Sequence, residues 1–396
     1  MSEPAKASVA DATHCVHAGE ERHGTNASLT TDIAQTSVFV MPSLDELRRY
    51  AEGKSKAYMY SRYANPTTTV AEQKIAALEG AEACVVTASG MAAELAIFMA
   101  LCESGDEIVS MLDLYGGTTK LFQSVLPRFG IRTRLVPFTE LDEIERYFSE
   151  RTRLLFLETP TNPTLRCADI RKLAAIGQRH NAVVVVDNTF ATPILQKPLA
   201  LGADITIHSA TKYLGGHNDL TAGAVAGSRQ RLDTIREMVK FTGGCLDPLG
   251  SFLLIRGLKT LEIRVERACA NARLIAEALR KHEQVGRVLY PGFADDPGHD
   301  IARRQMGDFG MMVSFETRGG GPAAEKFIDS LQLWYLATSL GGVESTVSYP
   351  LLSSHVGLTD EQLKLLDVSA ATVRLSVGIE HPADLVADIE QALDRA

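Results

Sequence analysis

Residues 183–190 read VVVVDNTF. The four valines form an apolar, β-branched run that ends in the carboxylate of Asp187. A run without polar alternation is typical of a strand in a parallel sheet whose two faces are both covered. Short runs of this kind alternate with helical periodicity between about residues 63 and 255, and this alternation predicts βαβ units. The sequence therefore predicts an α/β fold with a mostly parallel sheet flanked by helices.

Three of the expected strands end in polar residues, namely Glu158, Asp187 and His208. In sheets of this type ligands bind at the carboxyl ends of the strands, so we expect the chemistry at that edge. The expected strands lie at 83–87, 107–111, 154–158, 182–187, 204–208 and 222–226, and the expected helices at 68–79, 90–101 and 170–180.

The two ends of the chain differ from this middle part. Residues 1–62 have little sustained apolar periodicity and one helix at 43–51, capped by Ser43 with Glu46 three residues later. We expect them to form an arm that contacts a neighbouring subunit. Residues 256–396 predict a smaller α+β domain, and residues 63–255 the main α/β domain. The α+β part is expected to contain helices at 258–282, 323–331 and 383–393, and strands near Val288, at 311–316 and at 373–379.

Composition excludes several functional classes. The 396 residues are too many for one compact core, and 45% hydrophobic with 22% charged residues is ordinary for a globular protein. A formal net charge of -9 argues against a nucleic-acid partner, which needs clustered Lys and Arg. The N-terminus has no apolar signal segment and no run is long enough to span a membrane, so we expect no membrane association.

Cysteine and histidine spacing predicts no metal site. The six cysteines are scattered without a C-x-x-C pair, and the ten histidines show no H-E-x-x-H pattern. Such cysteines are typical of reduced thiols in a cytoplasmic protein.

Residues 208–213 read HSATKY and supply an amine beside two hydroxyls. Taken singly, Lys212 could be a surface lysine and Asp187 a cap at a strand end. Together with Ser209 and Thr211 they provide an amine for an aldehyde, a carboxylate for a pyridine nitrogen and hydroxyls for a phosphate. These are the groups that an enzyme needs to hold pyridoxal phosphate.

Three further segments favour an anion-binding site. Residues 87–93 place small residues at a helix N-terminus, where backbone N–H groups can approach a phosphate. Tyr60 and Arg62 point to the same side of an extended segment and together suit a phosphate. Arg374 lies on an apolar strand and needs an anion partner, either a substrate carboxylate or an internal acid. An S-x-x-K acyl-enzyme site also matches residues 209–212, but the accompanying S-D-N and K-T-G motifs are absent.

Taken in order, these segments resemble the Cys/Met-metabolism family of pyridoxal-phosphate enzymes, of fold type I, from about His17 to the C-terminus. The resemblance is closest to cystathionine γ-synthase and cystathionine γ-lyase. The matching motifs lie at 60–62, 65–67, 89–91, 115–118, 158–163, 186–190, 209–213, 339–345 and 374–380.

The resemblance implies a role for each motif residue. Lys212 would bond the cofactor and later move protons, and Tyr115 would stack on the ring and help deprotonate the substrate amine. Asp187 would pair with the ring nitrogen, and Asn162 would contact the ring hydroxyl and the substrate. The phosphate would be held by Ser89, Gly90, Met91, Ser209 and Thr211, together with Tyr60 and Arg62 from a neighbouring subunit. Arg374 and Ser339 would bind the substrate carboxylate. Glu344 would bind a distal amino group of the substrate.

The implied activity is γ-replacement or γ-elimination on a sulfur amino acid or an activated homoserine, by a homotetramer built as a dimer of dimers. Methionine γ-lyases resemble one another in having a cysteine at the position of Gly117. The glycine found here makes a methionine γ-lyase a less favoured interpretation. The alternatives are an O-acylhomoserine sulfhydrylase, a methionine γ-lyase or a specialised γ-replacement enzyme. A non-enzyme scaffold would be expected to have lost Lys212, Asp187 or Arg374. The roles of Asp32 and of segment 353–355 stay open.

Overall fold

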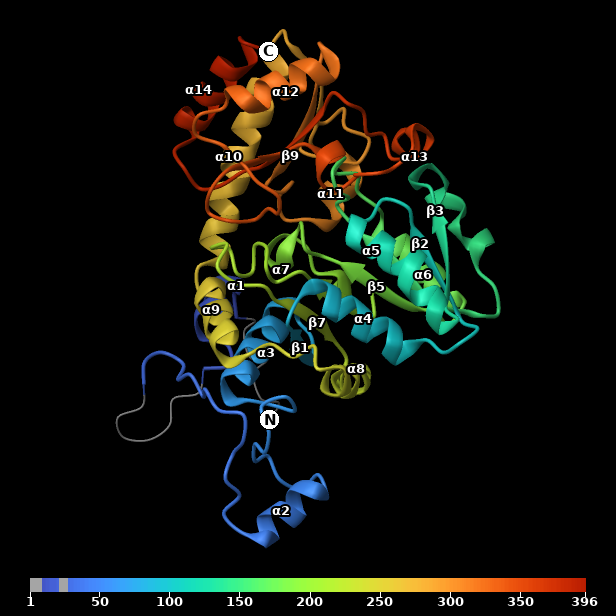
Figure 1. Cartoon of the computed structure of the whole chain (residues 1–396), viewed down its shortest axis with the longest axis vertical. Helices are drawn as coiled ribbons and strands as arrows, with labels where there is room; N and C mark the ends of the chain where they lie inside the picture. The colour runs from blue at the N-terminus through green and yellow to red at the C-terminus, as the bar shows by residue number, and fades with distance from the viewer. Residues whose placement is uncertain (1–8, 21–27) are drawn as a thin grey trace, which may run out of the picture.

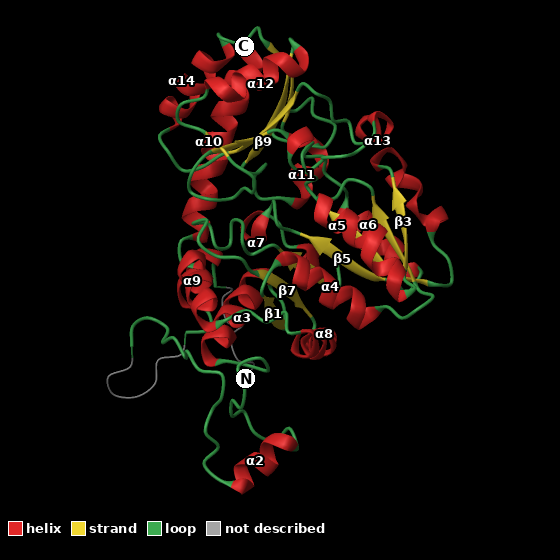
Figure 2. Cartoon of the chain, viewed as in Figure 1, coloured by secondary structure: helices red, strands yellow, loops and turns green. Residues whose placement is uncertain are grey.

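The computed structural model describes residues 9–20 and 28–396. In this part of the chain two sheets form separate layers, one built from the middle of the chain and one from its C-terminal third (Figures 1 and 2). The long helix α10 runs beside the second sheet (Figure 1). Over the same described ranges, no helix combines the length and the apolar character needed to cross a bilayer.

The larger sheet has seven strands within the described residues, in the order β1-β7-β6-β5-β4-β2-β3. Every neighbouring pair is parallel except those made by β7, which runs antiparallel to β1 and to β6. The strands are β1 (Ala83–Thr87), β2 (Glu107–Met111), β3 (Arg132–Val136), β4 (Thr152–Glu158), β5 (Val183–Asp187), β6 (Ile205–His208) and β7 (Gly223–Gly227).

Both faces of this sheet are buried, as its apolar strands predict. Val85 and Val225 are paired in register and pack into one core cluster, whereas their neighbours Val86 and Ala224 pack into another. Val185, in the middle of β5, is fully buried. The covered faces explain why the strands lack polar alternation.

The smaller sheet has the order β10-β11-β12-β9-β8 in the described chain and is antiparallel apart from the β10–β11 pair. Its strands are β8 (Val285–Leu289), β9 (Met312–Thr317), β10 (Tyr335–Leu336), β11 (Thr346–Ser348) and β12 (Thr372–Ser376). A third core cluster lies on one face, between this sheet and helices α10, α12 and α14. The other face is therefore free to carry polar side chains toward the larger sheet.

The helices are α1 (Asp11–His17), α2 (Leu44–Ala51), α3 (Pro66–Glu79), α4 (Gly90–Leu101), α5 (Gly116–Lys120), α6 (Ile170–Arg179), α7 (Thr192–Leu195), α8 (Arg229–Thr242), α9 (Pro248–Leu258), α10 (Leu261–Lys281), α11 (His299–Gln305), α12 (Gly320–Ser330), α13 (Asp360–Leu365) and α14 (Pro382–Leu393). Short 3₁₀ or π turns lie at η1 (Leu121–Val125), η2 (Leu126–Phe129), η3 (Phe138–Tyr147), η4 (Pro198–Leu201) and η5 (Pro350–Leu352).

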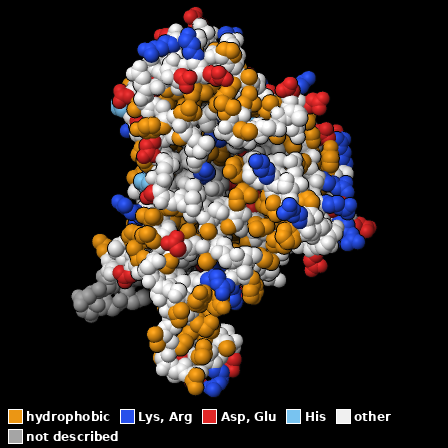
Figure 3. Space-filling model, in the orientation of Figure 1, with side chains coloured by type: hydrophobic (Ala, Val, Ile, Leu, Met, Phe, Trp, Pro, Cys, Tyr) orange, Lys and Arg blue, Asp and Glu red, His pale blue; other side chains and the backbone are white. Residues whose placement is uncertain are grey.

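The segment that carries α2 projects away from the rest of the molecule (Figure 1). Ser43 caps α2 as predicted, because its hydroxyl accepts a hydrogen bond from the backbone N–H of Glu46 at 3.1 Å. No side chain of α2 is buried, and Val40 and Leu44 are 95% and 78% exposed. Hydrophobic side chains gather on this projection (Figure 3). The apolar side chains of this projection therefore have no covering partner within the part of the chain that the structure describes.

The helix predicted over 258–282 is confirmed as α10, which begins at Leu261 because Thr260 leaves helical geometry. Several other elements were not predicted, among them α9, which begins at Pro248 under an Asp247 cap. Strand β3 was not predicted. It reads RTRLV and forms the edge of the sheet, where alternating charged and apolar side chains are stable because one face is open.

Candidate active site

A cavity of about 410 Å³ lies at the carboxyl ends of β4, β5 and β6, between the two sheets. It is the place that the strand-end residues predicted. The structure brings most of the predicted site residues into its wall: Ser89, Gly90, Met91, Tyr115, Asn162, Asp187, Ser209, Thr211, Lys212, Ser339 and Arg374.

Lys212 follows β6 and extends into the cavity. Its Nζ donates a hydrogen bond to Ser339 Oγ at 2.5 Å. Burial, together with the nearby positive charge of Arg374, lowers the pKa of Lys212 to about 8. An ordinary lysine is almost fully protonated at neutral pH, whereas this one releases its proton far more readily, as a nucleophilic amine must.

Ser339 is held in a strained backbone conformation. Its φ is +81°, in the left-handed region that residues with a Cβ rarely adopt. The strain places two groups of one residue where they are needed: the hydroxyl meets Lys212, and the carbonyl accepts from Arg374 Nη2 at 2.9 Å. Strain of this kind is concentrated at functional sites.

Arg374 lies on β12, whose apolar neighbours Val373 and Leu375 face the third core cluster. Because successive strand side chains alternate, the guanidinium points to the opposite face, into the cavity. Its Nη1 donates to Asn162 Oδ1 at 2.8 Å, while its Nε is buried without a protein partner. Burial lowers the pKa of Arg374 to about 10, which leaves it charged at neutral pH. A buried cation with an unused N–H is suited to bind a carboxylate.

Three carboxyl groups line the same cavity: Glu94 and Glu158, which are buried, and Asp187, which is half-buried. Asp187 and Glu158 end β5 and β4 side by side in register. Asp187 Oδ1 accepts from the Thr189 N–H and Glu158 Oε2 from the Tyr115 N–H, both at 2.8 Å. Burial raises the pKa of both groups, and for Glu158 the charge of Asp187 adds to the effect. A carboxylate in this position is stabilised by a cationic partner.

Glu94 is the third acid, and it was not predicted as a site residue. It lies one turn into α4, where it is 3% exposed, and its Oε1 accepts from Thr118 Oγ1 at 2.7 Å. Its Oε2 is buried without a partner. Burial raises the pKa of Glu94 to about 8, so the group is mostly protonated at neutral pH.

The N-terminus of α4 faces Ser209 closely. A Cβ on Gly90 would lie 3.0 Å from Ser209 Cβ, so glycine permits this approach. Ser89 Oγ accepts from the Ala92 N–H at 3.1 Å and leaves other first-turn N–H groups for an anion. Thr211 bonds the backbone of Ala222 through its hydroxyl, which both accepts and donates.

Tyr115 lies beside the glycine pair at the start of α5. It is 49% exposed, and a Cβ on Gly117 would lie 2.4 Å from its Cε1. Across the cavity opening, a Cβ on Gly116 would lie 2.6 Å from the Ser354 carbonyl oxygen. Ser353 and Ser354 thus line the cavity with Tyr115, although their sequence matched no known pattern.

Three predicted residues lie outside this cavity. Arg62 donates to the Lys240 carbonyl oxygen, and its Cζ lies 5.4 Å from the centroid of the Tyr60 ring. Neither Tyr60 nor Arg62 lines the cavity. Glu344 accepts from Asn218 Nδ2 at 2.7 Å and does not reach the cavity wall. The carboxylate at residue 344 therefore has a protein partner of its own.

The fold and the cavity together define an enzyme that uses pyridoxal phosphate. The residues present fit that cofactor, because a readily deprotonated amine, a half-buried carboxylate and a closely packed helix N-terminus match its aldehyde, ring nitrogen and phosphate. Residues 12–394 match the model of the Cys/Met metabolism PLP-dependent enzymes, and the chain belongs to this family.

The chain is similar to several characterised members. It is 43% identical to L-methionine gamma-lyase of Fusobacterium nucleatum subsp. polymorphum, over 97% of this chain and 98% of that protein. It is 42% identical to chloroplastic cystathionine gamma-synthase 1 of Arabidopsis thaliana, over 97% and 69%. The crystal structure of metB from Corynebacterium glutamicum superposes with a TM-score of 0.91 at 40% identity, covering 98% of each chain.

Proposed function

We propose that this enzyme catalyses γ-elimination or γ-replacement on a sulfur amino acid or an activated homoserine, in the manner of cystathionine γ-synthase and γ-lyase. One observation carries the proposal: Lys212 and Arg374 both contact Ser339, one through the hydroxyl and the other through the carbonyl. A substrate carboxylate on Arg374 would place the adjacent amino carbon within reach of the Lys212 amine.

In the proposed mechanism, Arg374 and Asn162 bind the substrate carboxylate and orient the molecule. Bound pyridoxal phosphate supplies an electron sink for the carbanion that forms beside the carboxylate. Lys212 Nζ takes the proton from that carbon and can return it, since its lowered pKa lets it both accept and release protons near neutral pH. Tyr115, over the cavity mouth, helps to remove the proton of the incoming amine.

The remaining wall residues hold the cofactor. Asp187 is assigned to the ring nitrogen, since a carboxylate whose pKa is raised by desolvation is stabilised by a cation. Asn162 also contacts the ring hydroxyl. The phosphate is assigned to the start of α4 and the loop after β6, through Ser89, Gly90, Met91, Ser209 and Thr211.

A second copy of the chain is proposed to complete the site. Tyr60 and Arg62 lie outside the cavity of their own chain and are assigned to the phosphate of a neighbour. The exposed apolar side chains around α2 support the assignment of residues 1–62 as a subunit-contacting arm. We propose a homotetramer of two such dimers, located in the cytoplasm, with residues 63–255 and 256–396 as the two domains of each subunit.

The choice among related activities rests on the cavity mouth. Glu344 is proposed to meet the distal amino group of a cystathionine-like substrate, which would require it to leave Asn218. Methionine γ-elimination is the second candidate, favoured by the 43% identity to a methionine γ-lyase. An O-acylhomoserine sulfhydrylase or a specialised γ-replacement enzyme would use the same residues with another nucleophile.

The test has two stages. Wild-type protein saturated with pyridoxal phosphate should show a visible absorbance band that Lys212→Ala abolishes and Lys172→Ala, at an exposed ion pair, retains. Products are then identified with cystathionine, methionine, O-acetylhomoserine and O-succinylhomoserine, each with and without cysteine. Saturated wild-type protein without the band would end the proposal. With the band present, the products decide among the activities.

A further inference from the structure

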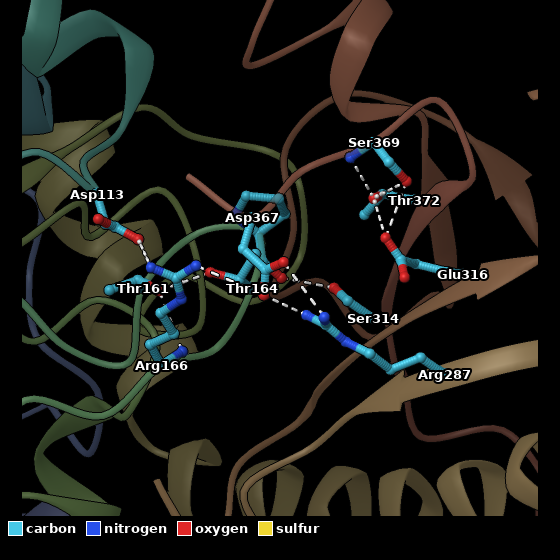
Figure 4. Close-up of polar contacts among 11 residues, drawn as sticks. Asp113, Thr161, Thr164, Arg166, Arg287, Ser314, Glu316, Asp367, Ser369 and Thr372 are labelled. Atoms are coloured by element: carbon cyan, nitrogen blue, oxygen red, sulfur yellow. Dashed lines mark hydrogen bonds and ion pairs between the residues drawn. The ribbon is translucent and has the colours of Figure 1, made fainter. Parts of the chain in front are cut away.

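Arg166 links loops that belong to the two sheets (Figure 4). It lies in the loop between β4 and α6, and its Nη1 donates to Asp113 Oδ1 at 3.3 Å. Its Nη2 lies 3.5 Å from Asp367 Oδ2, on the segment that leads into β12. Arg287 of β8 pairs with the same Asp367, at the more exposed end of the cluster.

The contacts of Arg166 connect three segments that carry residues of the proposed active site. Its loop also carries Asn162, which accepts from Arg374, and the Pro163 carbonyl, which accepts from Ser314 of β9 at 2.6 Å. Asp113 lies two residues before Tyr115. One side chain therefore joins the Tyr115 loop, the Asn162 loop and the smaller sheet that carries Arg374.

The contact to Asp113 cannot be lost without consequence. Asp113 is 1% exposed, and its Oδ2 is already buried without a partner. Burial raises the pKa of Asp113 to about 6, and the nearby charge of Arg166 opposes that rise. Without Arg166 the carboxylate would be buried and uncompensated, and it would have to take up a proton or move, together with the loop that carries Tyr115.

We infer that Arg166 is a positioning residue: it sets the distance between Asn162 and Arg374 across the two sheets and so shapes the site for the substrate carboxylate. This inference rests on the proposed function. A positioning role differs from a purely structural one, because the loss of a purely structural arginine would weaken the binding of all ligands of the cavity equally.

The experiment compares two small ligands on the holoenzyme, followed by the change in visible absorbance. Glycine has an amine and a carboxylate, whereas ethylamine has only the amine. Arg166→Met should weaken glycine binding by about 10- to 100-fold, the scale expected when one hydrogen bond to a charged group is lost. Ethylamine binding should stay within about two-fold. Arg287→Met is the matched control and should change neither ligand by more than about two-fold, because its ion pair is half exposed.

A second variant separates positioning from folding. In the Arg166→Met/Asp113→Asn double variant the uncompensated carboxylate is gone, so thermal stability should recover while glycine binding stays weak. Equal loss of glycine and ethylamine binding, or glycine binding that recovers with stability, would overturn the inference and leave the proposed function standing. Wild-type holoenzyme that does not respond to glycine would overturn both.

Discussion

Glu94 makes the stability of this protein depend on pH in a way that one substitution should remove. The carboxyl is buried in the cavity wall, and burial raises its pKa from 4.5 to about 8. Between these two values the folded protein keeps a proton that the unfolded chain has released. The free energy of unfolding therefore falls as pH rises through this window and is level above it.

The magnitude follows from the pKa difference. Each pKa unit corresponds to about 1.4 kcal/mol, so a rise from 4.5 to about 8 lowers the free energy of unfolding by about 5 kcal/mol. The whole decrease has occurred once the pH exceeds about 8. About 3 kcal/mol of this decrease has already occurred at pH 7, which lies about 2.5 pH units above the pKa of the unfolded chain.

Glu94→Gln keeps the shape of the protonated acid and its contact with Thr118, but it does not titrate. Its stability gain over wild type should be near zero at pH 4.5 and rise to a few kcal/mol at pH 8. Urea unfolding can be followed by the fluorescence of Trp334, the one tryptophan of the sequence, which is 4% exposed. Cofactor-free protein at one fixed concentration avoids contributions from binding and assembly.

The control is Glu361→Gln, at an exposed position on α13. It should follow the wild-type profile. Parallel profiles for wild type and Glu94→Gln across pH 4.5 to 8 would refute the argument that a buried, protonated carboxyl is present at residue 94.

Three further outcomes are expected. The rate at which cofactor-free protein bonds pyridoxal phosphate, followed by absorbance, should increase with pH and level off above about 8, where Lys212 has lost its proton; a flat rate would contradict the lowered pKa. Gly116→Ala should lower kcat/KM about ten-fold or more, because its Cβ would lie 2.6 Å from the Ser354 carbonyl, and unchanged kinetics would show that the mouth is not packed as described. Arg236→Met should reduce the free energy of unfolding by about 3–5 kcal/mol, since it leaves buried Glu72 unpaired; an unchanged urea midpoint would disprove this.

Local patterns were enough to predict the centre of the cavity. Asp187 ends one buried strand and Lys212 follows another, and parallel strands bring their carboxyl ends to one edge. Arg374 was visible as a charge within an apolar strand. The family resemblance added Asn162 and Ser339, whose neighbours along the chain carry no such signal.

The parts that were missed depend on contacts between distant segments. Glu94 lies in a helix that is apolar on nearly all sides, so its sequence does not tell which face meets the cavity. The inferred role of Arg166 depends on its ion pairs with Asp113 and Asp367, which are 53 and 201 positions away in the chain. Ser354 enters the cavity wall only because its loop folds back over the start of α5.

The projecting segment around α2 has a consequence for handling the protein. A lone chain would expose Val40 and Leu44 to water and would lack phosphate ligands if these come from a neighbour. Dissociation would then weaken the binding of the cofactor and, at the same time, expose an apolar surface that promotes aggregation. We expect dilute stocks to lose their yellow colour and to precipitate together, and excess pyridoxal phosphate to delay both.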